Sequence, residues 1–493
     1  MLTTIETFLS NKGPMRSDCW IGFGMCKLKI LTRIFAEPVG LLFLFLYNSI
    51  LCRYPNPKRC PLSQRCLLRV AYCAWRSRLP RAYSVKQNYV SIRTFASTGR
   101  TMAGLKEVVI VSAVRTPVGS FRSSLSSVPA PQLGAVAIKA AVERAGIKPE
   151  SVQEVYMGNV CQGFLGQAPS RQAALGAGLP VNTPCTTVNK VCASGLKAVM
   201  MASQSLMCNH QQVMVAGGME SMSNVPYYLA RGELPYGGVQ LTDGIVFDGL
   251  QDAYDKIHMG NCAEKTAKDH SIPKDEQDKY ALESYKRAAA AWQQGVFKSE
   301  IVPVTVKAKR GPDVVVAEDE EYKKVDYAKL PTLRPAFQKE GGTITAGNAS
   351  SLNDGACALV LMTADAARQH NVKPLARILG FGDAAVKPID FSIAPAHAMP
   401  KVLQQCGVKA EDVDLWEINE AFSVVVLANM KLLNLDHSKV NIHGGAVSLG
   451  HPIGMSGARI LTHLVHTLKT GQKGMAGICN GGGGAAAMLI EKL

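Results

Sequence analysis

The chain has 493 residues, of which 47% are hydrophobic, so it can bury a large core and its length suggests two to four domains. Its formal charge of +16 would suit a nucleic-acid-binding protein, but residues 1–100 carry 16 Lys and Arg against 3 acidic residues. Residues 101–493 hold a net charge of only +3, which argues against nucleic acid as a partner.

The first 105 residues read as a basic leader, disordered or removed in the working protein. Arginine recurs among Ser, Leu and Ala, and no acidic residue occurs between Cys60 and Lys106, a composition typical of a mitochondrial transit peptide and hence of a matrix protein. The apolar run Pro38–Leu51 is shorter than the ~20 residues that span a bilayer, so we expect no stable membrane insertion. A signal anchor, or an internal start at Met102, stays open as an alternative.

Fourteen cysteines are distributed as 6 in residues 1–100 and 8 beyond them. No two follow a C-x-x-C spacing, so zinc ribbons and thioredoxin-like pairs lack support. The cysteines of the body lie in apolar or Gly-rich segments, as free thiols do in a reducing compartment.

In chain order, residues 106–223 alternate strand and helix. The predicted elements are a strand and turn at Glu107–Phe121, a helix at Ala130–Gly146 closed by Gly146, a strand at Val152–Val160, a helix at Ser170–Leu179, a strand at Cys185–Cys192, the helix that starts at Cys192, and a strand at Gln211–Ser223. This alternation predicts an α/β fold with a mainly parallel sheet covered on both faces.

Residues 351–493 repeat the order. A strand is predicted at Pro374–Val386. Three further segments each begin with a predicted strand: Val413–Leu433 and Lys439–Leu468, in which a helix follows, and Gly474–Leu493. Both halves end in an apolar strand that runs into glycines, so we interpret them as two copies of one unit. Residues 224–350, which are more charged and turn-rich, form an insertion between them.

Four residues at the ends of these strands are candidates for chemistry. Apolar residues follow Cys192 at helical spacing, which places it at a first helical turn where N–H groups and the dipole stabilise a thiolate. Cys479 precedes four glycines, His451 lies in a Gly-rich loop, and Asn419 lies at a strand-to-helix turn. Each has a plainer alternative: a packing cysteine, a satisfied turn histidine, or a helix-capping asparagine. The loop "GHPIGMSG" matches no nucleotide motif.

The stretches "NKVCASG", "NEAFS", "GHPIGMSGAR" and "CNGGGG" resemble, in order and spacing, the four active-site motifs of the thiolase family, over residues 106–493. The resemblance implies duplicated α/β halves in five layers, α-β-α-β-α, with an inserted loop domain. It implies an acyltransferase that condenses two acetyl-CoA to acetoacetyl-CoA and CoA, and cleaves acetoacetyl-CoA or 2-methylacetoacetyl-CoA, in ketone-body metabolism and isoleucine degradation. It also implies a homotetramer built as a dimer of dimers.

The family's mechanism implies a role for each candidate. Cys192 carries the acyl group as a thioester, His451 activates it, and Cys479 exchanges the proton of the second acetyl-CoA. His451 and a water on Asn419 stabilise the enolate oxygen, while N–H groups of Cys192 and Gly481 form a second oxyanion hole.

The resemblance extends to ligands, with no covalent cofactor implied. Positions matching CoA contacts are Tyr285, Lys324, Val325, Asp326, Lys329 and Ser350, and positions matching a potassium site are Tyr285, Ala346, Gly347, Ala349 and Val447. Gly347 stands where alanine is expected, and His443 where asparagine is common. The segment Lys256–Glu264 resembles the covering loop of short-chain enzymes.

Two other functions remain open. A longer-chain 3-ketoacyl-CoA thiolase of fatty-acid β-oxidation would share the motifs. A catalytically silent lipid carrier or RNA-binding scaffold would share the fold, but it need not retain both cysteines and the histidine.

Overall fold

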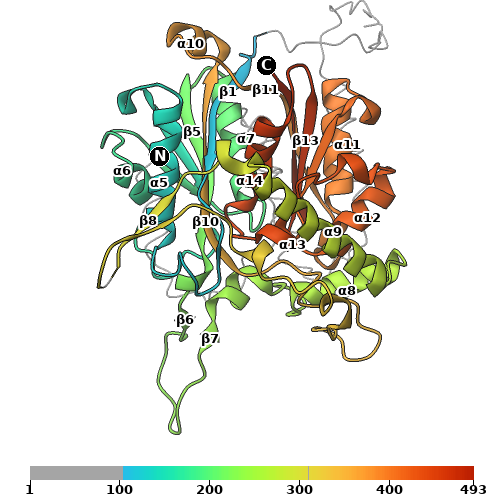
Figure 1. Ribbon diagram of the computed structural model, residues 1–493. Helices are drawn as coiled ribbons and strands as arrows, with labels where there is room; N and C mark the ends of the chain where they lie inside the picture. The colour runs from blue at the N-terminus through green and yellow to red at the C-terminus, as the bar shows by residue number, and fades with distance from the viewer. Residues whose placement is uncertain (1–103, 309) are drawn as a thin grey trace, which may run out of the picture. The chain divides into compact units, whose positions relative to one another are not determined.

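Two groups of strands organise the chain in this computed structural model, which describes residues 104–308 and 310–493 (Figure 1). The first group runs β1-β10-β5-β3-β4 and the second β11-β14-β13-β12. A short antiparallel pairing of β1 with β11 joins them. The strands of the first group are β1 (Val108–Arg115), β2 (Gly119–Ser120), β3 (Glu154–Gly158), β4 (Cys185–Val188), β5 (Val213–Ser221) and β10 (Asn353–Thr363). Those of the second are β11 (Ala376–Ala385), β12 (Leu415–Ile418), β13 (Lys473–Asn480) and β14 (Gly484–Lys492).

Helices cover both groups and also separate them, so the five layers implied by the sequence are confirmed (Figure 1). The middle layer holds α7 (Ser194–Met207) and α14 (Ser456–Thr467), whose side chains share one core with strands of both groups. The outer layers hold α5 (Ala130–Arg144) and α6 (Pro169–Gly176) on one side, α11 (Pro395–Cys406) and α12 (Ser423–Leu433) on the other. The short helices α10 (Ala364–Gln369) and α13 (Ala446–Leu449) connect elements.

Burial on both faces explains the composition of the central strands. Every residue of β1, β5 and β10 is buried, because helices lie on each side, and these strands are therefore near-continuous apolar runs rather than alternating ones. Glycine occurs where backbones meet: a Cβ on Gly218 of β5 would lie 2.0 Å from the carbonyl oxygen of Gly454. The strand and the loop that carries His451 are therefore in direct backbone contact.

The prediction of a mainly parallel sheet is wrong. Among the named strands of residues 104–493, only β3–β4, β3–β5 and β12–β13 pair in parallel, whereas β1, β10, β11 and β14 pair antiparallel with every named strand beside them. A strand that returns after a long excursion can enter the sheet in either direction, which periodicity does not reveal. The predicted strand at Cys185–Cys192 ends at Val188, and residues 440–444 form only isolated bridges.

The inserted region carries its own short elements. These are the hairpin β6 (Tyr227–Tyr228) and β7 (Thr242–Asp243), a π-helical turn (Val246–Leu250), α8 (Met259–Asp269), α9 (Lys274–Gln293), and the hairpin β8 (Val304–Val306) and β9 (Val314–Val316). The next strand, β10, follows residue 350 but pairs with β1 and β5, so it completes the first sheet rather than opening the second. The first sheet is therefore built from chain on both sides of the insertion.

The predicted leader, residues 1–105, lies almost entirely outside the described residues, as does the apolar run Pro38–Leu51. Within the described part of the chain, no helix is both long and apolar enough to cross a bilayer.

Candidate active site

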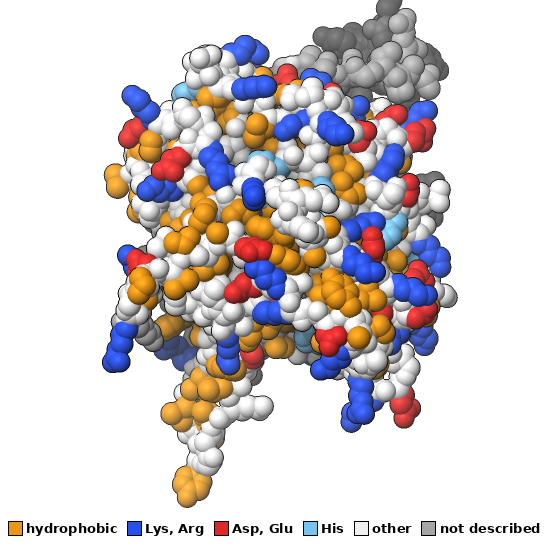
Figure 2. All heavy atoms as spheres, viewed as in Figure 1, with side chains coloured by type: hydrophobic (Ala, Val, Ile, Leu, Met, Phe, Trp, Pro, Cys, Tyr) orange, Lys and Arg blue, Asp and Glu red, His pale blue; other side chains and the backbone are white. Residues whose placement is uncertain are grey.

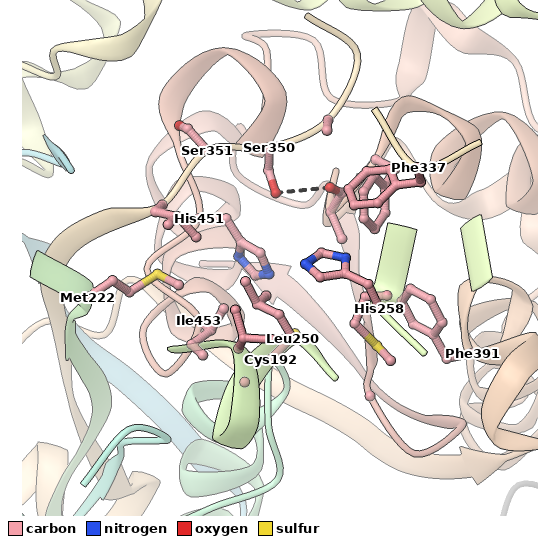
Figure 3. Close-up of a pocket in the computed structure, with 18 residues that line it drawn as sticks. Cys192, Met222, Leu250, His258, Phe337, Ser350, Ser351, Phe391, His451 and Ile453 are labelled. Atoms are coloured by element: carbon pink, nitrogen blue, oxygen red, sulfur yellow. Dashed lines mark hydrogen bonds between the residues drawn. The ribbon is translucent and has the colours of Figure 1, made fainter. Parts of the chain in front are cut away.

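A cavity of about 320 Å³ opens between the two halves and the inserted region (Figure 3). Cys192 lies at its base, with the rings of His451 and His258 above it in the view. The remaining wall is mostly apolar: Met222, Val246, Gly249, Leu250, Met259, Phe337, Ala349, Ser350, Ser351, Leu352, Phe391, Ala421, Phe422, Ile453 and Gly481. Such a wall suits a small acyl group and its thioester, and it excludes water from the thiol.

A strained turn presents Cys192 to the cavity. Val191 has φ +47°, a left-handed conformation that is unfavourable for a β-branched residue. Its N–H donates to Asn189 Oδ1 at 3.0 Å, and its carbonyl accepts from the hydroxyl of Ser194. Helix α7 begins at Ser194, so Cys192 precedes the helix rather than occupying its first turn as expected.

Burial, rather than the helix N-terminus, dominates the protonation of Cys192. Burial raises the pKa of its thiol to about 11, although backbone N–H groups of Gly481 and of Cys192 itself act in the opposite direction. The expected stabilisation of a thiolate comes from these N–H groups, and burial outweighs it in the free enzyme. Cys192 is a thiol at neutral pH and needs a base.

His451, which lines the same cavity, is the candidate for that base. Its main-chain N–H donates to Asn353 Oδ1 at 2.8 Å, and its Nδ1 lies 2.6 Å from Ser456 Oγ. Because the hydroxyl of Ser456 also donates to the carbonyl of Pro452 at 3.0 Å, it accepts from Nδ1–H, which leaves the lone pair on Nε2. Burial, and then the charge of Arg459, lower the pKa of His451 to about 3, so the ring is neutral.

Cys479 is next to last in β13 and fully buried, and it packs in one apolar cluster with the cavity residues Met259, Phe391, Ala421 and Phe422. Burial, and then an ionised Cys192, raise the pKa of Cys479 well above that of an ordinary thiol. Asn419 follows β12 and is also fully buried; neither its amide oxygen nor its nitrogen has a hydrogen-bond partner among the described residues. Buried amide groups normally have such a partner, so this one is available to a ligand or water.

The residues matched to CoA and potassium gather mainly at a second hollow of about 360 Å³. Its lining includes Tyr285, Lys324, Val325, Asp326, Lys329, Ala346 and Gly347. Val447 packs against Tyr285 in the same apolar cluster. Ser350 and Ala349 instead line the cavity of Cys192, where Ser350 Oγ donates to the carbonyl of Ala421 at 2.9 Å (Figure 3).

The oxygen atoms at this hollow fit a potassium ion. Burial, followed by the charge of Glu321, raises the pKa of Tyr285, so the phenol stays neutral and offers an oxygen lone pair. Among residues 104–308 and 310–493, no three His, Cys, Asp or Glu side chains gather as metal ligands. A cation here would have the Tyr285 hydroxyl and the carboxylates of Glu321 and Asp326 as candidate side-chain ligands, and potassium accepts oxygen ligands.

The sequence interpretation missed two polar residues of the site. His258 faces the cavity, accepts from the N–H of Gly260 at 3.0 Å and stacks on Phe337 with 4.7 Å between ring centroids. Glu220 is fully buried and accepts from the N–H groups of Val160, Cys161 and Gly454. His258 belongs to the segment interpreted as a covering loop, and Glu220 is a lone carboxylate in an apolar strand.

Comparison with known proteins identifies the chain as an acyltransferase. The family model described as thiolase, N-terminal domain, matches residues 108–365, and that of the thiolase C-terminal domain matches residues 372–492, so the chain belongs to the thiolase family.

Named relatives agree with this assignment. Mitochondrial acetyl-CoA acetyltransferase of Bos taurus is 69% identical over 79% of this chain and 92% of its own length. The enzyme of Homo sapiens with the same name is 63% identical over 90% of this chain and 99% of its own length. The crystal structure of Acat5 thiolase from Ascaris suum in complex with coenzyme A is 49% identical, with a TM-score of 0.77 over 79% of this chain and 100% of that one.

Proposed function

We propose that the chain is a mitochondrial acetyl-CoA C-acetyltransferase, which forms acetoacetyl-CoA from two acetyl-CoA and cleaves acetoacetyl-CoA or 2-methylacetoacetyl-CoA with CoA. The observation that carries the proposal is the convergence of Cys192, His451 and Gly481 on one cavity, several of whose wall residues pack in one apolar cluster with Cys479. Like the relatives named above, the enzyme is mitochondrial. We assign it to the matrix, in ketone-body metabolism and isoleucine degradation.

Acyl transfer to Cys192 is the first half of the reaction. His451 Nε2 takes the thiol proton as the Cys192 sulfur attacks the thioester carbonyl of acetyl-CoA. The carbon–sulfur bond to CoA breaks, CoA leaves with the proton from His451, and Cys192 keeps the acetyl group. The N–H groups of Cys192 and Gly481 stabilise the oxyanion; removal of one such donor typically costs about 3–4 kcal/mol of transition-state stabilisation.

Carbon–carbon bond formation is the second half. His451 takes the proton of Cys479, and the resulting thiolate removes a methyl proton from the second acetyl-CoA. The enolate oxygen accepts hydrogen bonds from protonated His451 and from a water on the free amide of Asn419. The enolate carbon attacks the acetyl group, the bond to Cys192 breaks, and His451 returns its proton to that sulfur. Both thiols and the neutral imidazole are restored.

The second hollow is the proposed site of the CoA nucleotide and of potassium. Lys324, which also pairs with Glu321, and Lys329 line it and suit an anionic nucleotide. Potassium held by Tyr285, Ala346, Gly347, Ala349 and Val447 would fix the loop that leads from this hollow to Ser350 in the catalytic cavity.

We further propose a homotetramer, supported by two separate apolar surfaces. Phe164 and Val181 are exposed near β4, which is an edge strand of the sheet among the described residues. Side chains of α6 hold their loops there, because they donate hydrogen bonds to the carbonyls of Val181 and of Leu165, the residue after Phe164. The projecting β6–β7 hairpin carries a second set of exposed apolar side chains (Figures 1 and 2). A dimer of dimers needs two different self-complementary surfaces on each chain, and these two exposed apolar surfaces are the candidates for them.

Thiolysis kinetics test the proposal. We expect the purified protein to cleave acetoacetyl-CoA with a kcat/KM at least tenfold higher than for a ten-carbon 3-ketoacyl-CoA, and faster in potassium than in sodium buffer. The opposite preference would identify a longer-chain thiolase, absence of turnover on both substrates would indicate a silent carrier, and equal rates in the two buffers would remove the potassium site.

A further inference from the structure

Lys190 lies two residues before Cys192 in the first half of the molecule, and its side chain contacts residues of the second half. Its Nζ donates to the main-chain carbonyl of Ala485 on β14 at 2.9 Å and forms an ion pair with Asp383 on β11. Both partners belong to the second group of strands, whereas the backbone of Lys190 belongs to the loop between β4 and α7. A single side chain therefore bridges the two halves next to the nucleophile.

The far end of this bridge is tied to the second cysteine. In the antiparallel register of β13 and β14, Ala485 is the direct cross-strand partner of Cys479. Lys190 thus connects the loop that presents one sulfur to the backbone pair that holds the other. We infer that Lys190 is a positioning residue for carbon–carbon bond formation, setting the Cys192 loop at its distance from the strand of Cys479; the inference rests on the proposed function.

The near end of the bridge is rigid. The N–H of Lys190 donates to Ser194 Oγ at 2.8 Å, and its carbonyl accepts from the N–H of Ala193 at 3.2 Å. The left-handed Val191 lies between Lys190 and Cys192, and such strain persists only where surrounding contacts hold it. A shift of the lysine backbone would therefore move the cysteine with it.

Asp383 also pairs with a second lysine, Lys197, at 2.6 Å. Lys197 lies on α7 and has no contact with Ala485 among its hydrogen bonds. The side chains of this triad are partly exposed, between 23% and 38%, so each pair adds little to stability. The distinctive contribution of Lys190 is its bond to Ala485, and Lys197 supplies a matched control.

The two half-reactions respond differently to this geometry. Acyl transfer uses Cys192 and His451, whereas condensation also requires Cys479 to reach a methyl group that lies against the acetyl carbon. Reacting atoms must approach to about 3–3.5 Å, and a misplacement of about 1 Å costs roughly a hundredfold in rate. The loop of His451 is in backbone contact with β5 of the first group, so Cys192 and His451 shift together, and loss of Lys190 should slow condensation and spare acyl transfer.

The test compares these rates in Lys190→Met, Lys197→Met and Lys190→Arg, using the full-length protein. Exchange of labelled CoA with acetyl-CoA reports acyl transfer, and acetoacetyl-CoA formation reports condensation. We expect Lys190→Met to lower the condensation rate at least tenfold and the exchange rate less than twofold. Lys197→Met should leave the ratio of the two rates unchanged. Lys190→Arg should restore much of the condensation rate. Thermal unfolding of each variant accompanies the assays.

Equal loss of both rates in Lys190→Met, no loss, or the same split in Lys197→Met would overturn the inference. If Lys190→Met does not fold, the variant Asp383→Asn provides the test, because it removes the ion pair but leaves the hydrogen bond from Lys190 to Ala485. The condensation rate should then fall by less than tenfold while the exchange rate is retained. An equal fall in both rates would again overturn the inference. Wild-type protein without exchange or condensation would instead reject the proposed function.

Discussion

At the scale of single residues, the protonation of the site follows from burial. Sequence motifs indicate which cysteine and histidine meet, and the structure brings Cys192 and His451 to one cavity. Their protonation states cannot be derived from the motifs, because a helix N-terminus and burial shift a thiol pKa in opposite directions. Only the structure decides between the two effects, and at Cys192 burial prevails.

The raised pKa of Cys192 predicts the pH dependence of its alkylation. Because the thiolate is the nucleophile and the pKa is about 11, its fraction in the free enzyme should increase about tenfold for each pH unit between 7 and 10. We expect the iodoacetamide inactivation rate to rise in the same way, with mass spectrometry locating the adduct on Cys192. A plateau below pH 8 would show that the free enzyme already holds a thiolate.

Substitution of each cysteine in turn should separate their two roles in the reaction. Cys192→Ser should remain folded and fail to form an acetyl-enzyme. Cys479→Ala should still acquire 1 acetyl group on Cys192, because acyl transfer needs only Cys192 and His451, yet lose condensation by about a thousandfold or more. Intact-mass spectrometry after addition of acetyl-CoA checks both results. Turnover that continues in Cys192→Ser with an adduct elsewhere would contradict the assigned nucleophile.

At the scale of elements, the repeated order of strands and helices was predictable, and their directions were not. The helices α5, α6, α7, α12 and α14 have the expected places because apolar spacing and flanking glycines mark them. The place of strand β10 could not be predicted from the repeat, because its partners β1 and β5 precede the insertion in sequence. Pairing between distant segments leaves no local pattern.

The close contact between β5 and the His451 loop gives a prediction at this scale. A methyl group at Gly218 would overlap the carbonyl of Gly454, so Gly218→Ala should displace the loop, destabilise the protein by about 3 kcal/mol and reduce activity. Thermal unfolding and thiolysis assays measure the two effects. In the control Gly382→Ala, the nearest atom is a side-chain methyl of Val402 at 3.2 Å, and stability should change by less than about 1 kcal/mol. Equal effects of the two substitutions would contradict the importance of the contact.

At the scale of the whole molecule, the projecting hairpin predicts how the proposed tetramer would divide into dimers. Leu234 and Tyr236 lie in the loop between β6 and β7 and are exposed in the single chain. Replacing both with aspartate should leave dimers, because the surface around Phe164 and the edge of β4 is untouched. Light scattering after size exclusion measures the mass, with Phe164→Asp as the complementary variant. A hairpin variant that remains tetrameric would show that the hairpin makes no subunit contact.

The position of β1 has a consequence for protein synthesis. Val108 pairs with Thr363 and Arg115 with Cys357, so the first strand of the fold meets its neighbour only after more than 240 further residues have left the ribosome. At about 5–20 residues per second, the nascent chain carries an unpaired apolar strand for roughly 12–50 seconds. Such a strand is prone to aggregate, so we expect the first half of the fold to need protection by chaperones until β10 has been synthesised.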